Sequence, residues 1–148
     1  MTTKNEPNLD NWKLFLGRLK NPTTEVNIGL VGKYVELPDA YKSIVEGFIH
    51  AGASNETKVK VHYIAAESVN NTNAADKLKD LDGVMVAPGF GERGLEGKLA
   101  TIKYVRENKI PFFGICLGMQ CAVIEFGRNV LGLENANSFE MDANTPYP

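Results

Sequence analysis

The sequence predicts an α/β fold with a parallel sheet, on three observations. Short apolar segments of strand length recur along the chain, at 26–31, 83–86 and 112–115. Segments with helical periodicity lie between them. Glycine, proline or a capping residue bounds most of these segments. Strands that alternate with helices favour right-handed crossovers, which place the strands parallel in one sheet with helices on both faces.

The composition is that of one globular domain. The chain has 148 residues, of which 43% are hydrophobic, enough for a sizeable core. The net charge of −2 gives no electrostatic reason to expect nucleic acid or an anionic membrane as partner. Apolar runs are far shorter than a membrane span, and residues 1–7 lack the apolar core of a secretory signal. We therefore expect a cytoplasmic protein with no membrane partner.

The N-terminal part reads as a linker followed by one helix. Residues 1–8 have a linker-like composition, and 9–20 have the periodicity of a short amphipathic helix that ends before Asn21-Pro22. We assign residues 1–24 to this linker and leading helix, and 25–148 to the α/β domain.

The first half of the domain contains one strand–helix–strand unit. After the strand at 26–31, Asp39 is a candidate cap for a helix whose apolar side chains face inward, and Gly52 is predicted to lie just past its end. Residues 58–64 then alternate strictly between apolar and polar side chains, which predicts a half-exposed strand.

The second half continues the alternation. A short helix is predicted at 74–79, before the strand at 83–86, and a longer helix at 95–107, before the strand at 112–115. The segment from 117 to about 130 is apolar nearly all round, which predicts a buried helix.

Cys116 is the strongest candidate for chemistry. It follows a predicted strand and precedes a predicted helix, with Gly114 and Gly118 two residues away on either side. This arrangement resembles the nucleophile elbow of serine hydrolases, with sulfur in place of oxygen. A buried structural cysteine is the alternative, but a helix N-terminus favours the thiolate. Cys121 has no such setting, and we expect it to be structural and not bonded to Cys116.

A glycine-rich loop follows the strand at 83–86. Residues 88–94 contain the pattern G-x-G-x-x-G, which allows a dinucleotide site. The acidic residue expected at the end of the next strand is absent, since that place holds Ile115 and Cys116. The alternative is a loop whose backbone N–H groups form an oxyanion hole beside Cys116. The segment 29–34 is too short between its glycines for a phosphate loop.

A thiol nucleophile normally needs a base, and the sequence offers no convincing one. His50 lies near the end of a predicted helix, and His62 shares the polar side of its strand with two lysines. No spacing typical of metal ligands occurs, so we expect no metal site.

Four segments together resemble the amidotransferase domain of the CTP synthase family, one of the class I (triad-type) glutamine amidotransferases. Gly-Ile-Cys-Leu-Gly-Met-Gln at 114–120 resembles the nucleophile segment, and Gly-Phe-Gly-Glu-Arg-Gly-Leu-Glu-Gly-Lys at 89–98 resembles the oxyanion loop. Gly-Lys-Tyr-Val-Glu-Leu-Pro-Asp-Ala-Tyr-Lys-Ser at 32–43 resembles the first strand–helix connection. Glu-Asn-Ala-Asn-Ser at 134–138, with Glu140, resembles the glutamine-recognition segment.

The resemblance implies a fold and particular site residues. The fold would be a flavodoxin-like doubly wound parallel sheet, incomplete here, because residues 25–148 match the N-terminal part of the amidotransferase domain. Cys116 would attack the carboxamide of glutamine, and Gly89 and Leu117 would supply the N–H groups of the oxyanion hole. The glutamine-binding residues would be Gly89, Phe90, Leu117, Gly118, Met119, Gln120 and Glu140.

The resemblance also implies partners. L-glutamine would be the substrate, and the ammonia released would pass to a separate synthetase domain that converts UTP to CTP. No cofactor is expected in this segment. The parent enzyme would use ATP and magnesium, would be activated by GTP, and would be a homotetramer. The segment 33–43 and the loop around Arg93 would lie near the interface with the synthetase domain.

Two departures from the family pattern affect activity. Pro88 stands where the family commonly has glycine, which fixes φ and removes one N–H. The family's catalytic His and Glu follow the point where this chain stops, so we expect the segment alone to be catalytically poor. Two alternatives stay open: a non-catalytic glutamine-binding or interaction module, and a stand-alone cysteine hydrolase that uses His62.

Overall fold

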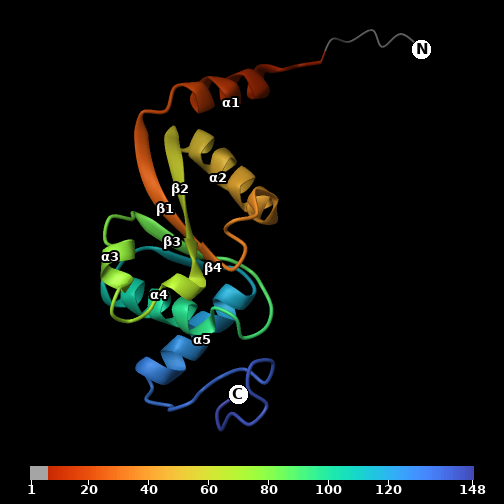
Figure 1. Ribbon diagram of the computed structural model, residues 1–148. Helices are drawn as coiled ribbons and strands as arrows, with labels where there is room; N and C mark the ends of the chain where they lie inside the picture. Colours follow the sequence, from red (N-terminus) through yellow and green to blue (C-terminus); the bar gives the residue numbers. More distant parts are fainter. Residues whose placement is uncertain (1–6) are drawn as a thin grey trace, which may run out of the picture. The chain divides into compact units, whose positions relative to one another are not determined.

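The computed structural model describes residues 7–148, and the predicted linker at 1–8 lies almost wholly outside them. The chain forms two compact units (Figure 1). The first contains residues up to Val26 together with Ser43–Lys60, and the second contains Asn27–Lys42 and Val61–Pro148. The boundary at 24/25 between leading helix and domain stays a prediction.

The first unit contains α1 (Asp10–Lys20) and most of α2 (Lys42–Ser54). The leading helix is confirmed, but it has no buried residue, and Trp12 is 55% exposed. Trp12 stacks on Phe15, which in turn stacks on His50 of α2.

The position predicted for Gly52 is wrong. Gly52 lies inside α2, which continues to Ser54. The backbone of Thr57 passes close to it, and a Cβ at Gly52 would lie 2.5 Å from the Thr57 carbonyl oxygen. Gly52 is needed for close approach and does not end the helix.

Four strands form one sheet in the order β2-β1-β3-β4. They are β1 (Thr24–Gly32), β2 (Thr57–Ala65), β3 (Gly83–Val86) and β4 (Phe112–Gly114). The β1–β3 and β3–β4 pairs are parallel, with Val31 opposite Val86 and Val86 opposite Gly114. The carboxyl ends of these strands therefore meet at one edge, where the sequence placed both the glycine loop and Cys116.

Helices flank the sheet. The parallel sheet and its helices confirm the predicted α/β fold. The second unit contains α3 (Ala74–Leu78), α4 (Leu95–Glu107) and α5 (Leu117–Asn129), with short 3₁₀ segments at Pro38–Tyr41 and Ala66–Ser68 (Figure 1). The hydrophobic core lies in this unit. It includes strand, α4 and α5 side chains such as Val31, Val86, Leu99, Ile102, Leu117 and Ile124.

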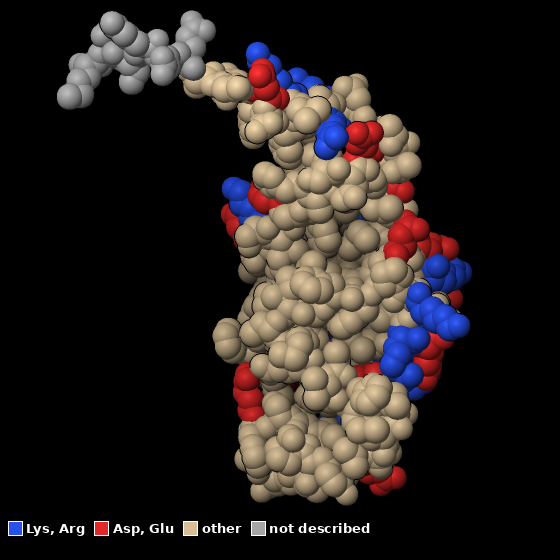
Figure 2. All heavy atoms as spheres, turned by 180° about the vertical axis from the view of Figure 1, so that it is seen from behind, with Lys and Arg blue, Asp and Glu red and all other residues tan. Residues whose placement is uncertain are grey.

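The expectation that α5 is buried all round is wrong. It buries one face, which includes Leu117, Cys121 and Ile124, but Met119, Val123 and Phe126 are 53%, 66% and 47% exposed. The helix has more apolar side chains than α4 and the sheet can cover, so the remaining ones face outward. Figure 2 shows few charged side chains on the surface of the C-terminal part of the chain, at the bottom of the view.

No helix within residues 7–148 combines the length and the hydropathy needed to cross a membrane.

Candidate active site

Cys116 lies at a strained turn between β4 and α5. Its backbone has φ 53° and ψ −109°, a conformation that costs a residue with a Cβ of order 1–3 kcal/mol. It is the N-cap residue of α5, and its carbonyl oxygen accepts hydrogen bonds from the N–H groups of Met119 (3.0 Å) and Gln120 (3.1 Å). The thiol is exposed and free. This is the geometry of a nucleophile elbow.

Gly114 and Gly118, on either side of Cys116, let neighbouring backbone segments pass closer than a side chain would permit. A Cβ on Gly114 would lie 2.6 Å from the carbonyl carbon of Gly118, and a Cβ on Gly118 would lie 2.2 Å from the carbonyl oxygen of Val86. The first turn of α5 is therefore packed directly on β3 and β4. The two glycines fix where Cys116 stands.

The glycine loop lies beside the start of α5. A Cβ on Gly89 would lie 3.6 Å from Leu117 Cδ2 and 3.6 Å from Lys98 Nζ. The N–H groups of Gly89 and Leu117, the pair expected to form an oxyanion hole, have no hydrogen-bond acceptor within residues 7–148. Both are thus free to donate to a ligand.

Glu140 contacts the same loop. Its Oε1 accepts a hydrogen bond from the N–H of Gly91 at 3.1 Å, although 49 residues separate the two in sequence. Gly91 has φ 68°. The contact joins the predicted oxyanion loop to the predicted glutamine-recognition segment. Phe90, which precedes Gly91 in this loop, is 79% exposed.

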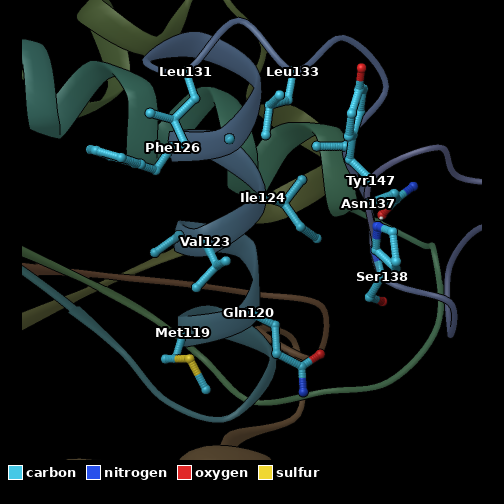
Figure 3. Close-up of a pocket in the computed structure, with 14 residues that line it drawn as sticks. Met119, Gln120, Val123, Ile124, Phe126, Leu131, Leu133, Asn137, Ser138 and Tyr147 are labelled. Atoms are coloured by element: carbon cyan, nitrogen blue, oxygen red, sulfur yellow. Dashed lines mark hydrogen bonds between the residues drawn. The ribbon is translucent and has the colours of Figure 1, made fainter.

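Gln120 and the segment after α5 line a pocket of about 600 Å³. In Figure 3, Gln120 and Ile124 point from α5 toward the segment that carries Asn137 and Ser138. The Ser138 hydroxyl oxygen is buried and has no partner within the part of the chain that the structure describes. Most of the lining is apolar, so its polar end at Gln120 is the part suited to an amide substrate.

Among the described residues of the second unit, no imidazole lies beside Cys116. The one histidine of this unit, His62, lies on β2, and β2 and β4 are at opposite edges of the sheet. Its Nε2 lies 2.9 Å from Asn27 Oδ1. His50 belongs to the first unit.

Cys121 has the structural setting that the sequence predicted. It is fully buried in the core and free. Burial raises the pKa of its thiol, which Lys98 partly opposes.

No group of three or more His, Cys, Asp or Glu side chains suited to a metal occurs within residues 7–148.

Arg93 links three segments of the second unit. Its Nη1 donates to Glu67 Oε1 at 2.6 Å, and its guanidinium lies 5.4 Å from the centre of the Tyr34 ring. These residues, with others of 33–37, line a second pocket.

Lys33 and Lys98 are the residues that the sequence analysis missed. Their Nζ atoms donate to carbonyls of the glycine loop, and both side chains are buried. The signal for Lys98 was its spacing, since it occupies an inward position of α4 among Leu95, Leu99 and Ile102. A lysine in a core stripe needs polar partners.

Comparisons with known proteins agree with this geometry. The model of the family "Glutamine amidotransferase class-I" matches residues 36–146, well over half of the chain. The chain is 66% identical over 148 residues to a CTP synthase of Cytophaga hutchinsonii, with all of this chain and 28% of that protein covered. It is 58% identical over 149 residues to a CTP synthase of Methanocaldococcus jannaschii, with 97% of this chain and 28% of that protein covered.

A solved structure is also similar. The glutaminase domain of Trypanosoma brucei CTPS, with bound acivicin, superposes with a TM-score of 0.75 at 39% identity, and covers 82% of this chain and 48% of that one. The chain thus spans little more than a quarter of the curated relatives and about half of this glutaminase domain. With its nucleophile elbow and its matching fold, the chain belongs to the class-I glutamine amidotransferase family.

Proposed function

We propose that the chain carries the nucleophile and the oxyanion loop of a glutaminase. The Cys116 thiolate attacks the side-chain carboxamide carbon of glutamine, the C–N bond breaks, and the nitrogen leaves as ammonia after taking up a proton. Water then cleaves the glutamyl thioester, which gives glutamate and regenerates the thiol. The observation that carries this proposal is the elbow geometry of Cys116 next to two free N–H groups.

Besides Cys116, four of the predicted site residues have specific roles in this scheme. The N–H groups of Gly89 and Leu117 stabilise the oxyanion. Gln120 and Glu140 position glutamine, and the carboxylate of Glu140 suits its α-ammonium group. The contact of Glu140 with the Gly91 N–H supports this role, because it holds the carboxylate beside the loop.

The names of the relatives suggest the use of the ammonia. We propose that it aminates UTP to CTP in a synthetase domain of the whole protein, with ATP, magnesium and GTP as activator. We also propose a cytoplasmic homotetramer. The Arg93–Tyr34–Glu67 cluster is the candidate contact with the synthetase domain.

The 148 residues alone should turn over glutamine very slowly. No imidazole lies beside Cys116 in the second unit, and removing a catalytic base costs several orders of magnitude in rate. Ammonia release in an enzyme-coupled assay is expected to be no greater than that of the C116S variant. Robust turnover that H62A abolishes would instead favour a stand-alone hydrolase.

An electrophilic glutamine analogue tests the proposal without turnover. We expect acivicin to label Cys116 and not Cys121, with a rate that saturates and that glutamine lowers. Peptide mass spectrometry locates the adduct, and C121A serves as the matched control. Glutamine binding without any labelling of Cys116 would favour a non-catalytic binding module.

A further inference from the structure

Two buried lysines hold the loop that carries the candidate oxyanion donor. Lys33, directly after β1, donates from Nζ to the carbonyl oxygens of Phe90 and Gly91, the latter at 2.9 Å. Lys98, on α4, has its Nζ 3.5 Å from the carbonyl oxygen of Ala87. The two ammonium groups therefore donate hydrogen bonds to carbonyl oxygens on both sides of Gly89 in the sequence.

Both lysines are unusually buried. Lys33 is 8% exposed and Lys98 is not exposed at all. A buried ammonium is costly unless hydrogen bonds compensate, and Lys98 has three N–H donors for one long bond within residues 7–148. Burial lowers the pKa of Lys98, and the charge of Lys33 adds to this effect. A helix made only for stability would have an apolar side chain at this position.

The geometry of the loop indicates that the two ammonium groups restrict the orientation of the Gly89 peptide. Lys98 Nζ and Leu117 Cδ2 both lie close to Gly89, so the loop is bounded by the cation and by the first residue of α5. The N–H of Gly89 is free, while the N–H groups of Ala87 and Gly91 are bound by Val31 and Glu140. Pro88 has a fixed φ and no N–H. With the flanking carbonyls held by ammonium groups, the Gly89 peptide has few other orientations.

We propose that Lys33 and Lys98 are positioning residues, which clamp the carbonyls of residues 87–91 so that the Gly89 N–H points to the substrate at Cys116. The role in catalysis rests on the proposed glutaminase function, but the clamp itself does not. The lysines act through the loop and do not touch the reacting atoms.

Hydrogen–deuterium exchange of the 148-residue chain tests the clamp directly. K98M keeps the length and apolar stem of the side chain but removes the ammonium. We expect the amides of Ala87 and Gly91 to exchange about tenfold faster in K98M, since charged hydrogen bonds to the loop are lost. Exchange in α4 and β3 should be unchanged. K103M, which removes an exposed lysine from the same helix, is the control and should leave the loop unaffected.

Cysteine labelling then tests the consequence for the site. The rate at which acivicin labels Cys116 should fall about tenfold in K98M, while iodoacetamide, which needs no oxyanion hole, should react as in the wild type. Equal loss with both reagents would mean that the elbow itself is disturbed, and would overturn the positioning role.

The two proposals fail in different ways. No acivicin labelling of the wild-type chain would contradict the glutaminase proposal, and the exchange experiment would still decide on the clamp. Unchanged loop exchange in a folded K98M, or faster exchange throughout the chain, would overturn the clamp. If K98M does not fold, K33M decides by the same two measurements, since Lys33 lies at the edge of the core and makes the shorter bonds.

Discussion

Gly118 leaves room for only a hydrogen atom where the first turn of α5 passes β3, and it thereby determines where Cys116 lies. In the G118A variant the methyl group would meet the Val86 carbonyl oxygen, so either α5 or β3 must move. We expect a loss of about 2 kcal/mol or more in the free energy of unfolding, measured by urea denaturation. G47A, in α2 with open space around the Cβ position, is the control and should gain up to about 1 kcal/mol. Equal stability of G118A and wild type would contradict the close contact.

Lys98 makes stability depend on pH in a definite direction. Because burial lowers its pKa in the folded chain, the unfolded chain binds more protons between that lowered pKa and the ordinary value of about 10.4. Stability due to this group therefore rises with pH in that window.

The K98M variant removes that dependence. The free energy of unfolding of wild type minus that of K98M should become more positive from neutral pH to about pH 10.4, the ordinary pKa of lysine. Both proteins are measured in the C121A background, because Lys98 lowers the pKa of the Cys121 thiol and its removal would therefore change the titration of that thiol. If the difference in free energy of unfolding does not change with pH, the pKa of Lys98 is not lowered by burial in the folded chain.

Single residues differed in how far the sequence revealed them. The place of Cys116 at a turn between strand and helix was predictable because its flanking glycines and the two elements are local in sequence, while its catalytic role stays a prediction. The hydrogen bond between Glu140 and Gly91 was not predicted, because it joins distant segments; the family resemblance only assigned both segments to the glutamine site. Lys33 and Lys98 were missed because a lysine is normally assigned to the surface, and only the packed structure shows the carbonyls that hold it.

At the scale of elements, one ion pair joins α4 to α5, the helices that follow the glycine loop and Cys116. Arg106 of α4 donates from Nε and Nη2 to Glu125 of α5, with the shortest distance at 2.7 Å. Glu125 is almost fully buried, and Asn129 also donates to it. The pair therefore fixes the position of α5 against α4.

Removing Arg106 should loosen α5. R106M leaves a buried carboxylate without its main partner, so we expect a loss of about 2 kcal/mol, less than for a fully buried pair because Arg106 is partly exposed. K103M breaks a comparable exposed pair with Glu107 and should have a much smaller effect. Urea denaturation measures both. A K103M effect as large as that of R106M would contradict the role of burial.

Element types and order were predictable from periodicity alone, and the bounds of α4 and β3 agree with the prediction. The exposure of α5 was not. An apolar pattern states that a helix face prefers burial, but which partner covers it depends on tertiary packing. The same limit applied to Gly52, whose need for glycine comes from a distant strand.

For the molecule as a whole, the uncovered face of α5 should govern its behaviour in solution. Met119, Val123 and Phe126 form an exposed apolar patch, and such patches promote association. We expect the isolated chain to self-associate as concentration rises, and V123K to reduce this. S43K, which adds the same charge at an exposed position of α2, is the control. Sedimentation velocity over a concentration series measures the effect, and identical profiles for V123K and wild type would contradict it.

The backbone of Cys116 has a consequence for how such a chain can evolve. Its φ of 53° suits glycine better than any residue with a Cβ, so C116G should exceed C116A in the free energy of unfolding by about 1 kcal/mol. The substitution that best relaxes the fold is thus one that removes the thiol. Mutational drift without demand for the reaction would favour glycine here, so the proposed glutaminase function implies that the cysteine is kept at a cost in stability.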